Sequence, residues 1–306
     1  MGNLKAHLAI LIANLIYAAS YGFSKDVLAG YIPPFAFILI RVIGATLLFW
    51  LVIAFTKRDK IDKKDFTTIA LCGLFGVAAN QLMFFEGLKN TISINASVIM
   101  VATPLIVLIL SRLILKETIK PQKALGVGIG MIGAIALIFS KAGGSEVSLY
   151  GDMFILLNAT SYGIYLVLVK PLMKKYNPIT IITWAFTFGL IMVLPFGLSQ
   201  WSEINWSFPA DIQWKIAFII LAMTFFTYLL NIYGLGKVSP TVVSAYIYLQ
   251  PILATIIALA QQKEELAFTT VLFGLMIFVG VFLVSVPLNK KTPKLKAANF
   301  KSDEKV

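Results

Sequence analysis

Residues 35–55 read FAFILIRVIGATLLFWLVIAF, an apolar run with a single charge, Arg41. The run is long enough to cross the hydrocarbon core of a bilayer, which takes about 20 predominantly apolar residues in a helix. The whole chain has this character, because 59% of its 306 residues are hydrophobic and only 13% are charged. A soluble domain has about 25% charged residues, so the composition excludes one and indicates an integral membrane protein.

Nine further stretches of similar length and character follow one another along the chain. With 35–55 included, the predicted spans are 4–24, 35–55, 66–88, 93–115, 122–140, 149–172, 179–199, 213–236, 241–262 and 267–287. The sequence has no alternation typical of strands, and a helix satisfies its own backbone hydrogen bonds where water is absent. We therefore expect an all-α integral membrane protein with ten transmembrane helices, followed by a polar, Lys-rich cytoplasmic tail over 289–306.

Basic residues predict the orientation, because they concentrate in cytoplasmic loops. With the N-terminus inside, twenty Lys and Arg residues fall in inner segments, five fall in outer segments, and Arg41 remains within a span. This distribution predicts cytoplasmic N- and C-termini and a multi-pass protein of the plasma (inner) membrane. The net charge of +12 is thus a topology signal, and we expect no nucleic-acid partner.

The two halves of the chain repeat a pattern of polar, Gly and Pro residues. A shift of 145 positions places Tyr17 on Tyr162, Lys25 on Lys170 and Pro33 on Pro178. A shift of 147 matches a longer run: Gly87 with Gly234, Ser97 with Ser244, Pro104 with Pro251, Lys116 with Lys263, Glu117 with Glu264 and Gly133 with Gly280. Each half holds five helices, an odd number, so the second enters the membrane from the opposite side. We expect two inverted five-helix repeats, 1–140 and 149–288, an architecture typical of secondary transporters.

These residues resemble an EamA-type domain. The similarity lies in Tyr17 to Lys25, Pro33 and Arg41, in the run from Gly87-Leu88-Lys89 to Thr103-Pro104 and Lys116-Glu117, and in the second copies Tyr248-Leu249-Gln250-Pro251 and Lys263-Glu264. It covers about residues 4–287 and implies a member of the drug/metabolite transporter superfamily with two EamA-type repeats. Tyr stands at 17 and 162 where the family usually has Trp. Family members export amino acids and other small metabolites, and related branches move nucleotide-sugars or drugs.

Charged residues within predicted spans are costly and mark functional sites. We expect Arg41 to hold a carboxylate of the substrate and Glu86 to act as a counter-ion or a proton carrier. The alternatives are a structural ion pair for Arg41 and pairing of Glu86 with Lys89 one turn on.

Prolines and polar side chains complete the candidate substrate site. Pro104 and Pro251 occupy matching positions, where each is expected to interrupt a helix and free a carbonyl, with Thr103 and Gln250 directly before them. The remaining substrate-binding candidates share a polar group at membrane depth: Tyr17, Asn80, Gln81, Tyr162, Asn231 and Tyr246. A harmless kink for the prolines, and an interhelical hydrogen bond for any single polar residue, are the alternatives.

The sequence favours a secondary active transporter that exports small metabolites such as amino acids, by alternating access around a site between the repeats. A passive channel-like facilitator, or a transporter of drugs or nucleotide-linked sugars, is the alternative.

With one His and one Cys, no metal site or other cofactor is expected, and the chain is not expected to be an enzyme. Partners are the substrate and the lipid bilayer, and the chain is a monomer or a homodimer. Close packing, between the halves or in a dimer, is expected at Gly126, Gly130, Gly133, Gly274 and Gly280.

Overall fold

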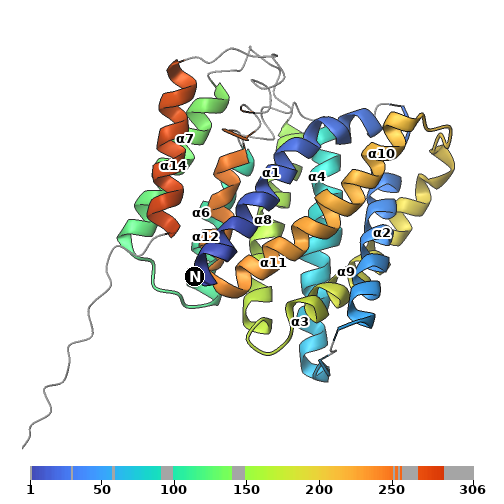
Figure 1. The fold of residues 1–306 in the computed structure, drawn as a ribbon, viewed down its shortest axis with the longest axis horizontal. Coiled ribbons are helices and arrows are strands. Elements are labelled where there is room, and N and C mark those ends of the chain that lie inside the picture. The colour runs from blue at the N-terminus through green and yellow to red at the C-terminus, as the bar shows by residue number, and fades with distance from the viewer. Residues whose placement is uncertain are drawn as a thin grey trace, which may run out of the picture.

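A computed structural model describes residues 2–28, 30–56, 59–90, 99–139, 149–250, 252–253, 256 and 268–285. Helices and short connections make up these ranges and no strand occurs within them, as the sequence predicts (Figure 1). The first half contains α1 (Gly2–Leu28), α2 (Pro34–Ala54), α3 (Lys63–Gly73), α4 (Ala79–Asn90), α6 (Thr103–Ile114) and α7 (Pro121–Phe139). The second contains α8 (Leu149–Leu172), α9 (Pro178–Ser199), α10 (Ala210–Phe218), α11 (Thr227–Lys237), α12 (Pro240–Ala245) and α14 (Phe268–Ser285).

Several helices are long and apolar enough to cross a membrane. Five such spans occur among the described residues: Pro34–Ala54, Lys63–Asn90, Leu149–Leu172, Pro178–Ser199 and Ala210–Lys237. Shorter apolar helices cover Leu4–Ser20, Thr103–Ile114 and Val271–Ser285. The chain is therefore a multi-pass helical membrane protein. The expected tail over 289–306 lies outside the described residues.

Helices at matching positions of the two halves pack against each other. The α2 helix runs along α9, and α7 runs along α14 (Figure 1). The α6 helix contacts α12, which belongs to the matching predicted span of the second half. Other contacts come in corresponding pairs, because α1 packs along α11 while α8 packs along α4. This set of contacts is the one that a two-fold relation between the halves predicts.

Glycines bring α7 and α14 unusually close together. A Cβ added at Gly280 would lie 2.6 Å from the backbone of Gly130, and one at Gly126 would lie 2.8 Å from the carbonyl oxygen of Gly280. A Cβ at Gly133 would likewise lie 2.9 Å from the Cβ of Met276. The expected close packing is confirmed at these positions, where it joins the two halves. It is wrong for Gly274, where an added Cβ would have only an ordinary contact at 4.0 Å.

Two spans contain a π-helical segment at matching positions. The α3 helix continues through η1 (Leu74–Ala78) into α4, and α10 continues through η3 (Ile219–Phe226) into α11. The 147-residue shift places η1 within η3. Segments of π-helix are rare and frequent at functional sites. Neither segment contains proline, and no local sequence pattern predicts them.

Around Pro104 the helical span is divided by a turn, and the helix is not simply bent. Val101 and Ala102 form a turn, α6 begins at Thr103, and Pro104 lies in its first turn. Proline costs nothing there, because the first N–H groups of a helix have no intrahelical partner. In the second half, α12 gives way to the 3-10 segment η4 (Tyr246–Tyr248). Residues 99 and 100 are also helical, so the helical span is interrupted at residues 101–102, directly before Pro104, as expected. Pro251 lies outside the described residues.

Candidate functional site

Arg41 is buried in the helix bundle, with 4% of its surface exposed. Its Nε donates a hydrogen bond to Oγ1 of Thr224 at 3.2 Å. The guanidinium carbon lies over the rings of Phe37 and Phe85, 5.6 Å from each centroid. Aromatic faces attract a cation through the ring quadrupole, so they offset part of the cost of burying this charge. Thr224 belongs to η3, so Arg41 also joins the two halves.

No carboxylate among the described residues forms an ion pair with Arg41. The ion pairs in this part of the chain are Lys175–Asp65, Lys215–Asp26 and Lys215–Asp211. Oε1 of Glu86 instead accepts a hydrogen bond from Nδ2 of Asn90 at 3.0 Å. A buried cation without a fixed counter-charge is costly, especially at membrane depth. The arrangement suits an anionic group that comes from outside the protein.

Tyrosines from three helices lie in the same interior region as Arg41. Tyr17 of α1 and Tyr228 of α11 lie within electrostatic range of Arg41, and Tyr162 of α8 lies near both tyrosines. The Tyr17 hydroxyl also lies near the side chains of Thr227 and Asn231. Tyr17 and Tyr162 hold matching positions in the halves, and both keep accessible surface although they face these interior groups. Their hydroxyls therefore add polar surface beside the buried charge.

The two π-helical segments shape this site through their carbonyl groups. The Tyr228 hydroxyl donates to the carbonyl of Gly76 in η1 at 2.8 Å, and the Ser161 hydroxyl donates to the carbonyl of Phe75 at 2.8 Å. In η3, Thr224 donates to the carbonyl of Ile219 at 2.9 Å while it accepts from Arg41. Each π segment thus supplies an acceptor to a side chain of the interior cluster. We call Arg41, Thr224, Tyr17, Tyr228 and Gln81, with the rings of Phe37 and Phe85, the Arg41 site.

The chain matches a family model twice along its length. The model describes the EamA-like transporter family, and it matches residues 4–139 and 149–286. This chain belongs to the EamA-like transporter family. The match confirms the resemblance carried by the Tyr17–Arg41 pattern and its repeats, and it identifies the chain as a membrane transporter.

Relatives of this EamA-family transporter are themselves named as transporters. An uncharacterized transporter of Archaeoglobus fulgidus is 27% identical over 290 residues, which cover 92% of this chain and 98% of that protein. The uncharacterized transporter YdfC of Bacillus subtilis is 29% identical over 278 residues, covering 90% and 89%. A solved crystal structure shares the fold, with a TM-score of 0.74 and 16% identity over 92% of this chain and 95% of that one.

Among the predicted substrate-binding residues of this EamA-family protein, Gln81 is the one with both side-chain amide atoms buried and without a hydrogen-bond partner in the described structure. It is 5% exposed and lies near the Tyr228 hydroxyl, but neither its Nε2 nor its Oε1 has a hydrogen-bond partner among the described residues. Burying an amide without partners costs free energy, and a hydrogen bond from a polar ligand group would recover part of that cost. Asn80, by contrast, hydrogen-bonds across helices, because it and Asn158 each donate to the other's backbone carbonyl.

The other expected residues lie in different surroundings. Tyr246 hydrogen-bonds with Nδ1 of His7 at 2.7 Å and lines a groove of about 560 Å³ between α1 and α14. Nε2 of Gln250 donates to Oδ1 of Asn14 at 2.9 Å. Thr103 is fully buried, and its hydroxyl has no partner in the described part of the chain. The structure thus gathers Arg41, Tyr17, Gln81, Tyr162 and Asn231 into one region.

Sequence reasoning missed Phe37, Phe85 and Thr224 as parts of the site. Phe37 had a signal, because it precedes Arg41 by four residues and so shares its helix face. Phe85 and Thr224 reach Arg41 only through tertiary packing, and no local pattern marks them.

Tyr228→Phe should lower the thermal stability of the protein in detergent, because it removes the hydrogen bond from α11 to η1. A hydrogen bond of this kind contributes about 1 kcal/mol, and the Gly76 carbonyl would lose its side-chain donor. Tyr165→Phe is the matched control, since the Tyr165 hydroxyl has no hydrogen bond to another described residue. Thermal unfolding followed by tryptophan fluorescence compares the two. Equal midpoints for both variants would show that the Tyr228 hydroxyl does not hold the π segments together.

Proposed function

We propose that this transporter is a secondary active exporter of small carboxylate-bearing metabolites, such as amino acids, in the plasma membrane. The observation that carries the proposal is Arg41, a buried cation held by Thr224 and two aromatic rings with no carboxylate partner in the described structure. A substrate carboxylate supplies the missing counter-charge. Charge-assisted hydrogen bonds from a guanidinium are roughly twice as strong as neutral ones, and they strengthen further in a dry site.

The remaining groups of the Arg41 site have roles that follow from their chemistry. Tyr17 and Gln81, together with Tyr162 beside the site, offer hydroxyl and amide groups to the polar parts of a substrate beyond its carboxylate. The Phe37 and Phe85 rings exclude water from the guanidinium, which strengthens its attraction for an anion. Such a site accepts a small zwitterion or acid and gives no preference to a neutral molecule of the same shape.

The proposed mechanism is alternating access around the Arg41 site. It assumes ten spans in two inverted repeats, 1–140 and 149–288, with both termini in the cytoplasm. The pairing of matching helices across the halves and the twofold match of the family model support this architecture. The excess of basic residues in the proposed inner segments supports the orientation.

Proton coupling through Glu86 is a separate element of the proposal. In proteoliposomes, Glu86→Gln should remove the stimulation of amino-acid flux by a pH gradient, because glutamine cannot carry a proton. Exchange between equal pools at one pH should persist, since Glu86 is not placed at the guanidinium. Glu203→Gln, an exposed acid outside the spans, is the control. An undiminished response of Glu86→Gln to the gradient would remove Glu86 from the coupling mechanism.

An untargeted comparison of culture media tests the exported class. Cells that produce the wild-type protein are compared with cells that produce equal amounts of Arg41→Gln. We expect small carboxylated metabolites to accumulate only in the medium of the wild-type cells. If the media are the same, or if they differ only in uncharged compounds, the proposed substrate class is wrong.

A further inference from the structure

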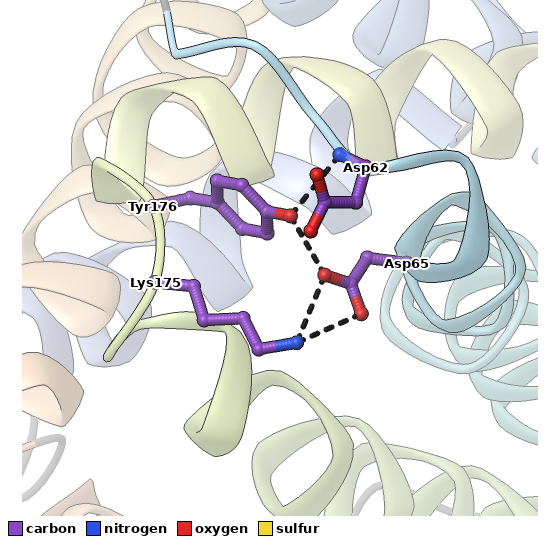
Figure 2. Close-up of polar contacts among 4 residues, drawn as sticks. All are labelled: Asp62, Asp65, Lys175 and Tyr176. Carbon is purple, nitrogen blue, oxygen red and sulfur yellow. Dashed lines mark hydrogen bonds and ion pairs between the residues drawn. The ribbon is translucent and has the colours of Figure 1, made fainter.

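A cluster of polar side chains joins the halves at the end of the bundle where α3 begins. Figure 2 shows Lys175 and Tyr176, from the connection between α8 and α9, reaching Asp65 in the first turn of α3. Nζ of Lys175 lies 3.1 and 3.0 Å from the two carboxylate oxygens, and the Tyr176 hydroxyl donates to one of them at 2.7 Å. The same hydroxyl accepts from the backbone N–H of Asp62 at 3.1 Å. The start of α3 is thus tied to the end of α8.

The opposite end of the bundle carries an ion pair at the corresponding junction. Nζ of Lys215 in α10 lies 2.9 Å from a carboxylate oxygen of Asp26, near the end of α1, and 3.2 Å from one of Asp211. The helices α1 and α8 hold matching positions in the halves, and so do α3 and α10. Figure 1 shows α3 and α10 near opposite ends of the bundle. Both contacts therefore join the end of one half's first helix to the start of the other half's third span.

Each junction pairs one buried charged group with a more exposed partner of opposite charge, and the buried group is an anion at one end and a cation at the other. The buried member is Asp65 at the α3 end, with 11% of its side chain exposed against 49% for Lys175. At the α10 end it is Lys215, with 16% exposed against 52% for Asp26. Each buried charge depends on its partner for compensation while the junction is closed. Once the halves separate there, water replaces the partner, so such a contact can open and close at little net cost.

The α3 end has more polar contacts among the described residues, whereas at the α10 end the Phe23 ring also packs against Trp214 and Phe218. The backbone N–H of Asn177 also donates to the carboxylate of Asp59, which adds a further link from the same connection. Hydrogen bonding to Asp65 raises the pKa of both Lys175 and Tyr176, so both remain protonated donors at neutral pH. At the α10 end, Lys215 shares its ammonium group between Asp26 and its own helix neighbour Asp211.

We propose that these clusters are paired closing contacts that release one at a time. We call them the α3 clasp (Asp65, Lys175 and Tyr176) and the α10 clasp (Asp26 and Lys215). The α10 clasp has fewer polar contacts than the α3 clasp among the described residues, so we expect it to open more readily and the resting protein to favour opening at the α10 end. This inference rests on the proposed alternating access, because only that mechanism requires the two ends to open in turn.

Two cysteines at matching positions report the opening of each end. Val169→Cys in α8 and Ser24→Cys in α1 are 145 residues apart, seven residues beyond Tyr162 and Tyr17 toward the α3 clasp and the α10 clasp respectively. Both positions are buried, at 0% and 7% exposure. Each is placed in a Cys72→Ala background, because Cys72 is the sole natural cysteine. Reaction with a water-soluble maleimide is timed in lipid nanodiscs, where both ends face the solution.

With both clasps intact, Ser24→Cys should react several-fold faster than Val169→Cys. Adding Lys175→Gln should speed the reaction at residue 169 and slow it at residue 24, whereas Asp26→Asn should do the reverse. Lys174→Gln, an exposed neighbour outside the clasp, is the matched control and should change neither rate. Restoration of the original rates by Asp65→Lys combined with Lys175→Asp would assign the effect to the ion pair and exclude a folding defect.

Clasp substitutions that leave both rates unchanged, or that speed both together, would overturn the inference. The charge-swapped pair keeps the ion pair but removes the acceptor of the Tyr176 hydroxyl, so rates that do not move back toward the original values at all would also overturn it. The assay uses no substrate, so it separates the two proposals. Reciprocal rates in a protein that moves no carboxylate would contradict only the proposed substrate class. Carboxylate transport that depends on Arg41 without reciprocal rates would contradict only the clasps.

Discussion

Arg41→Gln should weaken carboxylate binding by about 2–5 kcal/mol, a loss of roughly 30-fold or more in affinity. The substitution removes the cation that lies between Phe37 and Phe85 and leaves a substrate carboxylate without its counter-charge. The measurement is titration calorimetry on purified protein, with the standard amino acid that gives the largest thermal stabilisation of the wild type. Arg41→Lys tests the geometry, because it keeps the charge but lacks the planar guanidinium that stacks on the rings.

Stability provides the control for this prediction. Because Arg41 has no carboxylate partner among the described residues, its removal relieves a buried charge, and the ligand-free Arg41→Gln protein should unfold at the wild-type temperature or above it. Loss of binding then cannot be attributed to misfolding. Wild-type affinity in Arg41→Gln would remove Arg41 from the substrate site.

Gly126→Ala should lower the free energy of unfolding by about 1–3 kcal/mol, because the added methyl group has no room between α7 and α14. Its Cβ would lie 2.8 Å from the Gly280 carbonyl oxygen and 2.9 Å from the Cβ of Leu283, and neither atom can move aside alone. The helix propensity of alanine offsets at most about 1 kcal/mol of this loss. Thermal unfolding in detergent measures the change.

Gly128→Ala is the matched control on the same helix. An added Cβ at Gly128 meets no atom within 4 Å, so this variant should be as stable as the wild type or slightly more stable. Equal destabilisation by the two substitutions would mean that glycine acts through the backbone of α7. Close packing between α7 and α14 requires Gly126→Ala to be less stable than Gly128→Ala.

Much of the fold could be predicted because its signals are local or repeated in the chain. Apolar runs such as 35–55 predict helices directly, and the matches of Gly133 with Gly280 and Pro104 with Pro251 relate the two halves. The π-helical segments could not be predicted in this way. Leu74–Ala78 and Ile219–Phe226 read as ordinary apolar helix. The Gly76 carbonyl receives its donor, Tyr228, only through tertiary packing, and the bond from Thr224 to Ile219 within η3 has no signal in the apolar pattern.

Site residues could be predicted where a single side chain is energetically costly to bury within an apolar span. Arg41 is marked by its charge within an apolar run, and Tyr17 by its match to Tyr162. Glu86 carried the same signal as Arg41, yet it hydrogen-bonds with Asn90 on its own helix. Tyr246 also carried a polar group at membrane depth, but it faces His7. Burial cost identifies polar residues that need a partner, and only the packed structure shows whether the protein itself supplies one.

Counterflow in proteoliposomes tests the central claim most directly. Vesicles that contain the purified wild-type protein are loaded with unlabelled amino acids, and the uptake of each labelled amino acid is compared with that of its carboxamide derivative. The account predicts saturable, trans-stimulated uptake of at least one amino acid and none of its carboxamide. Equal uptake of acid and carboxamide, uptake that rises linearly with concentration as in a channel, or no uptake of any amino acid would contradict it.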